Sequence, residues 1–249
     1  MAKDKDPLVI YWSPHNSGEA PIIGDWNMMY PEPTNVFSDL MKIKNLESKD
    51  DSFRSCPAAT GRLKNMFVFK NGMNSEYEFD NTDPKNPWIR LISENGISVR
   101  YTRQSAWSNG ASLDFSMQHI FFAEEPVDAV FSPPFMHQAE YIKYGTCAPG
   151  TYDISKWFRP FVFEVQTWKP SGKFVLPEGD PLFYIEAFTD RKIILKRFVM
   201  TQTLHDYAQA CVKAKNDYGR HLPLVENYRR FTSSRMNELI LKEIKANLL

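Results

Sequence analysis

The sequence predicts a mainly β protein, with a β-sandwich or β-clip-like core followed by a C-terminal pair of α-helices, and thus an α+β chain overall. Short runs of alternating apolar and polar residues recur over residues 1–200, separated by turns rich in Pro, Gly and Asn. Hydrophobic residues make up 43% and aromatic residues 14% of the chain, which is typical of a globular core. From residue 201 onward Gly and Pro almost vanish, so we divide the chain into a β-rich domain, 1–200, and amphipathic helices, 201–249.

The densest aromatic stretch, residues 150–188, predicts the centre of the β core. Residues 161–168 alternate between apolar and polar side chains, as a strand covered on one face does. Residues 173–176 form a shorter run between two turns that contain Pro and Gly. Residues 182–188 are almost continuously apolar, which favours a strand buried on both faces.

The other elements follow the same patterns in chain order. The Asn95-Gly96 dipeptide between two apolar runs predicts a β-hairpin. Residues 36–43 are expected to be a short helix or strand, and residues 53–57 a strand or turn. The remaining expected strands cover residues 8–12, 64–70, 76–80, 88–92, 97–102, 113–123, 127–131 and 192–200.

Two helices are expected at the C-terminal end. Thr203 is a plausible N-cap for the first, with Asp206 in its first turn, and Gly219 is a natural stop. The second is expected to start near Pro223 and to run to Leu249. Three interpretations of this pair stay open: folding back on the β core, self-association or docking on a protein partner, and binding of a membrane surface or nucleic acid through its basic face.

Four sequence strings carry a resemblance to a known family: Ser55-Cys56-Pro57-Ala58, the run 64–70, Asp153-Ile154-Ser155-Lys156-Trp157-Phe158-Arg159-Pro160, and Gly179-Asp180-Pro181-Leu182. Over residues 11–198 the chain resembles an uncharacterised family of tailed-bacteriophage proteins, especially from phages of marine cyanobacteria and other marine bacteria. The resemblance implies a phage origin and carries no activity with it.

A second, fainter resemblance covers residues 150–189. Gly150-Thr151-Tyr152-Asp153, followed by a strand pair and a Gly179-Asp180 turn, is similar to the last strands of the dUTPase-like β-clip fold. The Ser-Ser-Gly phosphate loop and the Ala-Gly-Tyr-Asp nucleoside motif of that fold do not occur here. The resemblance therefore implies a shared fold without the dUTPase reaction.

Trp157 and Arg159 are the strongest binding candidates, together with Asp153 just upstream. They indicate either a binding edge, with Arg159 stacked on Trp157 or holding an anion, or a corner where Trp157 closes the core and Arg159 covers its rim. The long loop 13–33 offers Trp26 and Tyr30, either as a second binding element or as aromatic anchors of the loop.

The alternative hypothesis, an enzyme or a small-molecule binder on a dUTPase-like or cupin-like scaffold, depends on fewer signals. His119 and His137 are its metal candidates, and Arg159, Asp153 and Glu164 its polar ones. Their spacing lacks the His-x-His pattern of cupin-type iron sites, so we expect no metal or other cofactor. Cys56 has no His near it in sequence and is expected to be a buried structural thiol.

Charge and composition exclude other classes. The formal net charge of +0 argues against a dedicated nucleic-acid binder, and no apolar run reaches the ~20 residues of a membrane span. Three well-separated cysteines give no disulfide framework, which favours a reducing compartment. We therefore expect a non-enzymatic phage protein that binds a host or phage protein, either free in the host cytoplasm or incorporated in the virion.

Overall fold

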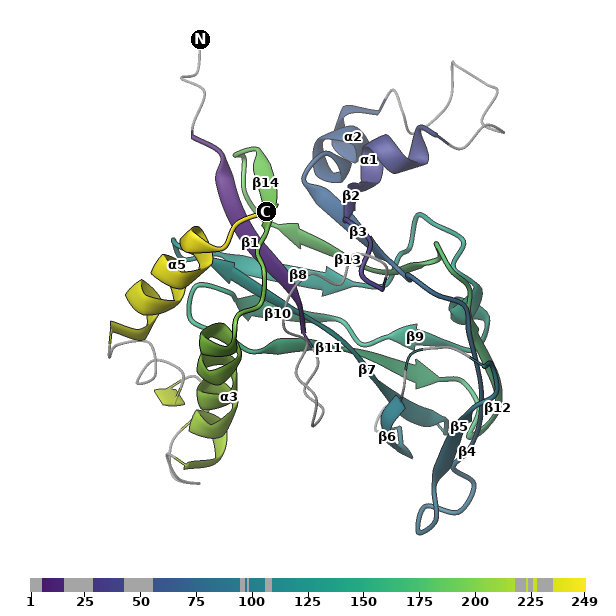
Figure 1. The fold of residues 1–249 in the computed structure, drawn as a ribbon. Coiled ribbons are helices and arrows are strands. Elements are labelled where there is room, and N and C mark those ends of the chain that lie inside the picture. The colour runs from purple at the N-terminus through teal and green to yellow at the C-terminus, as the bar shows by residue number, and fades with distance from the viewer. Residues whose placement is uncertain are drawn as a thin grey trace.

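The computed structural model describes residues 6–15, 29–42, 56–94, 97, 99–105, 109–217, 223, 226–227 and 235–249. Within these residues the chain forms three β-sheets and a set of short helices, with α3 and α5 together on one flank (Figure 1). The predicted class, mainly β with C-terminal helices, is confirmed.

The largest sheet has the order β14-β1-β7-β11-β9, with β6 added along β7. The parallel β1–β14 pair joins the two ends of the β-rich region, and β7 is a long strand that serves both β1 and β11. The strand bounds are β1 Leu8–His15, β6 Val99–Gln104, β7 Ala111–Ala123, β9 Gly145–Cys147, β11 Pro160–Thr167 and β14 Ile193–Arg197.

Two smaller sheets complete the β structure. A five-stranded sheet has the order β10-β8-β13-β3-β2, and a three-stranded sheet has the order β12-β4-β5. Their bounds are β2 Thr34–Asn35, β3 Met66–Lys70, β4 Ser75–Asp80, β5 Trp88–Leu91, β8 Asp128–Ser132, β10 Gly150–Asp153, β12 Ser171–Leu176 and β13 Pro181–Ala187. Every residue of β13 is buried, as its continuous apolar sequence predicts.

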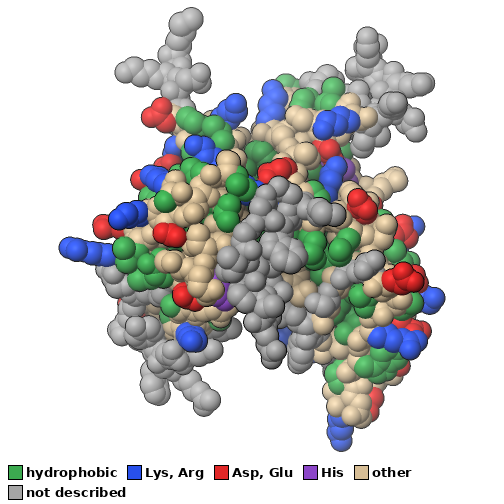
Figure 2. Space-filling model, in the orientation of Figure 1, with side chains coloured by type: hydrophobic (Ala, Val, Ile, Leu, Met, Phe, Trp, Pro, Cys, Tyr) green, Lys and Arg blue, Asp and Glu red, His purple; other side chains and the backbone are tan. Residues whose placement is uncertain are grey.

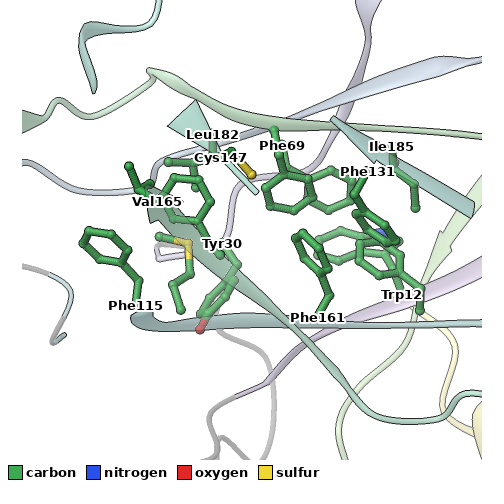
Figure 3. Packing of buried hydrophobic residues seen from close by; sticks show 14 of the residues in the cluster. Trp12, Tyr30, Phe69, Phe115, Phe131, Cys147, Phe161, Val165, Leu182 and Ile185 are labelled. Carbon is green, nitrogen blue, oxygen red and sulfur yellow. The ribbon is translucent and has the colours of Figure 1, made fainter. Parts of the chain in front are cut away.

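The main core lies between the six-stranded and five-stranded sheets and is built from aromatic rings. Phe69 of β3 and Phe183 of β13 stack with their centroids 5.0 Å apart, and Trp12 of β1 meets Phe69 edge-on at 5.4 Å. Figure 3 shows Trp12, Phe69, Phe131 and Phe161 gathered on one side of this core. Inward-facing aromatic residues from both sheets thus hold the two layers together.

The C-terminal helices pack back on the six-stranded sheet, which is the first of the three interpretations above. Leu204 and Ala208 of α3 (Gln202–Asp217) share a buried cluster with Ile240 and Ile244 of α5 (Asn237–Ala246) and with Phe122 of β7. The apolar faces of both helices are therefore covered by the chain itself.

The helix ends differ from the prediction. The amide of Leu204 donates to the Thr201 hydroxyl at 3.2 Å, so Thr201 and not Thr203 caps α3. The second helix is not continuous from Pro223 to Leu249, because Arg235 has a positive φ of 64° and α5 begins after it. It also ends early, since Leu248 forms a β-bridge with Phe198.

The predicted hairpin around Asn95-Gly96 is wrong. β5 pairs with β4 in the three-stranded sheet, where Glu78 lies opposite Arg90, whereas β6 pairs with β7. β5 thus pairs with the strand that precedes it in sequence and β6 with the strand that follows it, so the two strands flanking Asn95-Gly96 belong to different sheets despite the local turn signal. Residues 95 and 96 themselves lie outside the described part of the chain.

The region around Cys56 also differs from the prediction. Residues Pro57–Leu63 form helix α2, with Pro57 at its first turn, where a missing N–H costs nothing. Cys56 is the N-cap residue of this surface helix and is exposed rather than buried. The expectation of a buried thiol is therefore wrong at Cys56, whereas the other two cysteines, Cys147 and Cys211, are buried.

The remaining helices are α1 Val36–Leu40 and the 3-10 helix η2 Glu140–Lys143. Acidic and basic side chains are interspersed over the face drawn in Figure 2, without a large field of one sign. None of the helices in the described ranges has the length and apolar character needed to cross a bilayer.

Candidate functional site

A pocket of about 310 Å³ opens between the two larger sheets, beside β11 and β10. The residues around it come from β7, β8, β10, β11 and the connections that precede and follow β10. Five of them are aromatic: Phe121, Phe131, Tyr152, Trp157 and Phe161. The volume falls at the lower end of the range for small-ligand sites, and polar and apolar groups contribute in similar measure to the surface of the pocket.

The aromatic walls are packed against one another. Phe131 and Phe161 stack with their centroids 4.0 Å apart, and Tyr152 meets Phe131 edge-on at 5.3 Å (Figure 3 shows the two Phe rings). Tyr152 also meets Trp157 edge-on at 4.6 Å. Because each ring is held by a neighbour, the shape of the pocket is set before anything binds.

Arg159 lies at the pocket with its guanidinium carbon 5.0 Å from the centroid of the Trp157 ring. Burial raises the pKa of the Tyr152 hydroxyl, and the positive charge of Arg159 opposes this effect. Burial likewise raises the pKa of the Cys211 thiol of α3 to about 12, again opposed by Arg159. The charge of Arg159 thus acts on the pKa of a group in the pocket wall, Tyr152, and of a group in α3, Cys211.

The second charged group of the lining, Glu164, is already engaged. Its carboxylate accepts hydrogen bonds from the hydroxyl of Ser112, from the amide nitrogen of Gln166 at 2.5 Å and from Arg103 at 3.2 Å. A carboxylate with this many donors is fixed in place. All three bonds fall on Oε1, and they tie this carboxylate of β11 to β6 and β7.

The pocket adjoins a part of β11 that, among the described residues, pairs with a strand on one side only. Strand β9 pairs only with residues 165–167, after which the amide of Ala148 donates to the carbonyl of Glu164 at 2.9 Å. In the described part of the chain, no strand pairs with residues 160–163 on the edge away from β7. Pro160 and Val162 of this open edge line the pocket.

The predicted site residues are only partly brought together. Trp157 and Arg159 share the pocket, whereas Asp153 lies outside its lining. Burial alone would raise the pKa of Asp153, but hydrogen bonds from Lys156 and Ser155 outweigh burial and hold this pKa below its usual range. Asp153 thus stabilises the turn that leads to Trp157.

Of the two binding candidates in the loop 13–33, the structure describes Tyr30 but not Trp26. Tyr30 is buried, and its hydroxyl donates to the carbonyl of His15 at 3.2 Å, so it anchors the end of the loop to β1. Burial raises the pKa of Tyr30 well above its usual range. Trp26 lies outside the described residues.

The two histidine candidates lie in separate surroundings. His119 is buried among aromatic rings, 4.9 Å from Phe69 and 5.2 Å from Tyr30, and burial together with the charge of Arg197 lowers its pKa to about 3. His137 bonds to Tyr184 and, at 3.1 Å, to Asp39. Among the described residues, no three His, Cys, Asp or Glu side chains are grouped as a metal site requires.

Sequence reasoning missed the walls opposite Trp157. Phe131 and Tyr152 lie on β8 and β10, which pair with each other through Phe131–Gly150 and Ala129–Tyr152. A large aromatic residue on each of two short strands was the available signal. Nothing local indicated that both strands would face β11.

No family model, curated protein or solved structure matches this chain. What the site does must therefore be argued from its own geometry.

Proposed function

We propose that this chain is a non-enzymatic binding protein whose aromatic pocket receives an apolar side chain of a protein partner, with a negative charge next to it. The observation that carries the proposal is the arrangement of Arg159 over Trp157 at a pocket of about 310 Å³ with preset aromatic walls. Aromatic and Arg side chains supply most of the binding energy in protein interfaces, because they bury large areas at small entropic cost.

Photo-crosslinking tests this proposal in the cell. Replacing Trp157 with p-benzoylphenylalanine keeps an aromatic group in the pocket and makes it reactive towards whatever binds there. The matched control is Trp88 of β5, which also lies beside an arginine, with the Arg90 guanidinium 5.8 Å from its ring. A discrete crosslinked protein from position 157 and not from position 88 supports the proposal. Identical products from both positions contradict it.

The resemblance to tailed-phage proteins supports a phage origin, and with it a partner in the host cytoplasm or in the virion. Quantitative mass spectrometry of purified particles separates these locations. A stoichiometric copy number places the binding event in the particle. Absence from particles together with abundance in infected cells places it in the cytoplasm.

A second candidate function, binding of a small molecule, is favoured by the size of the pocket, which is at the lower end of the range for such ligands. A thermal-shift panel of nucleotides, including dUTP, and divalent metals tests it, because a ligand that binds only the folded state raises its stability by mass action. A rise in melting temperature that Trp157→Ala abolishes would favour the small molecule over the protein partner.

A further inference from the structure

The open edge of β11 presents backbone groups that an incoming strand would use. The carbonyl of Glu164 points towards β9, since it accepts from the amide of Ala148. The register shift between Val162 and Glu164 places its extra residues on β7 and not on β11. Alternate residues of β11 therefore still direct their N–H and C=O groups to one edge, and Val162 directs both groups to this side as well. Strand edges of this kind are templates for pairing with another chain.

The backbone edge and the pocket form one continuous surface. Val162 and Pro160 line the same pocket as Trp157 and Tyr152. A segment that paired with Val162 would place alternate side chains within reach of these rings, because side chains in a strand point to opposite faces in turn. Backbone pairing and insertion of a side chain are therefore available to the same ligand.

The charges at this surface favour an acidic segment. Arg159 contributes a positive charge that it cannot lose by deprotonation. The nearby negative charge of Glu164 is held by Arg103, Ser112 and Gln166. A positive charge in the lining of the pocket complements a carboxylate on the ligand.

We propose that the partner's contribution is an extended peptide segment that adds as a short strand to β11 along residues 160–163, inserts one aromatic side chain into the pocket and places an acidic residue near Arg159. This inference rests on the proposed function and specifies its ligand class. Strand addition of this kind takes its affinity from backbone hydrogen bonds and its specificity from pockets for alternate side chains.

Three defined probes test the inference with the unaltered chain, so that folding of a variant is not in question. The first is N-acetyltryptophanamide, which reports on the pocket alone. The second is the acetylated and amidated peptide Thr-Val-Trp-Val-Asp-Thr. The third is a pair of N-methylated twins of that peptide, one methylated at both valines and the other at the tryptophan and aspartate. Binding is followed by the backbone amide shifts of Val162 and Arg159 in NMR titrations.

The expected result is that the peptide binds at least tenfold more tightly than N-acetyltryptophanamide, and that one twin loses at least tenfold in affinity while the other keeps it. Only pairing along one edge of the peptide produces that asymmetry. If N-acetyltryptophanamide binds but both N-methylated peptides bind with the affinity of the parent peptide, strand addition is overturned, while the pocket remains a binding site for an aromatic group. If neither N-acetyltryptophanamide nor the peptide shifts the pocket amides, the proposed function itself fails.

Discussion

The guanidinium carbon of Arg159 lies 5.0 Å from the centroid of the Trp157 ring, on the segment that leads from β10 into β11. This pair brings a fixed positive charge to a pocket that four further aromatic residues also line. The contact satisfies both sequence-based interpretations in part, because Trp157 packs on Tyr152 while Arg159 stays at the lining.

The three cysteines should differ in reactivity. Cys56 is exposed, whereas burial raises the pKa of the Cys147 thiol to about 12, with Glu164 adding to the effect, and burial raises that of Cys211 to the same range. Since the thiolate is the reactive form, iodoacetamide at neutral pH should modify Cys56 and spare the other two until the chain unfolds. Peptide mapping before and after denaturation checks this. Rapid native labelling of Cys147 would contradict the fold around β9.

Gly110 and Gly61 should respond oppositely to alanine. A Cβ atom at Gly110 would lie 1.8 Å from the carbonyl oxygen of Thr167, and a backbone atom of β11 cannot simply move aside. We expect Gly110→Ala to lower the free energy of unfolding by about 1 to 3 kcal/mol or more. Gly61 lies in α2 with nothing within 4 Å of such an atom, so Gly61→Ala should add about 0.5 to 1 kcal/mol. Urea denaturation of both variants measures the difference.

Acid should destabilise the protein through His119. Burial, aided by Arg197, lowers the pKa of His119 to about 3 in the folded state, whereas the unfolded chain takes up the proton near its ordinary value of 6.5. The stabilising contribution of the neutral imidazole is therefore complete above pH 6.5 and is lost as the pH falls towards 3, at about 1.4 kcal/mol per pH unit.

Unfolding free energies between pH 7 and pH 4 measure this slope. The variant His119→Phe has no such proton and should show a slope smaller by about one proton, whatever its absolute stability. The remaining slope includes His137, whose pKa is also lowered, chiefly by burial. Equal slopes in the two proteins would show that His119 titrates normally in the folded state.

Substitutions at Ile240 and Leu239 of α5 distinguish two roles of this helix, packing on the β core and forming an interface with another molecule. Ile240 is fully buried, so Ile240→Ala should cost about 2 to 5 kcal/mol of stability. Leu239 is 46% exposed, so Leu239→Ala should change stability by less than about 0.5 kcal/mol.

The same two variants test the prediction of self-association through the C-terminal helices. Sedimentation of the wild type and of Leu239→Ala compares their masses at equal stability. A smaller mass for the variant supports an interface on the outer face of α5. Equal masses, together with the stability loss of Ile240→Ala, would leave α5 as a packing element of the β core.

The strands with strong local patterns could be predicted because their burial follows the period of two. Glu76-Tyr77-Glu78-Phe79 alternates in sequence, and β4 alternates between buried and half-buried residues in the structure. The continuous burial of β13 followed in the same way from its composition. Local sequence could not specify which strands pair, since β5 and β6 flank an Asn-Gly dipeptide and still join different sheets.

Only the part of the site formed by Trp157 and Arg159 could be predicted from the sequence. Trp157 and Arg159 stand two residues apart, so their contact is a local event that an aromatic and charged pattern can indicate. Phe131 reaches the same pocket through the pairing of β8 with β10 and the stacking of its ring on Phe161. Such contacts depend on the packing of two sheets, which no single stretch of sequence encodes.

Isothermal titration calorimetry with indole-3-propionate tests the binding role of the pocket most directly, because this probe combines an aromatic ring with a carboxylate. We predict saturable binding that Arg159→Gln weakens about tenfold, as expected for loss of a charge-assisted contact. Arg90→Gln serves as the control, since Arg90 also lies beside a tryptophan but is remote from the pocket lining. It should bind the probe as the wild type does. Absence of binding to the wild type, or equal affinity in wild type and Arg159→Gln, would contradict the assignment of this pocket as the binding site.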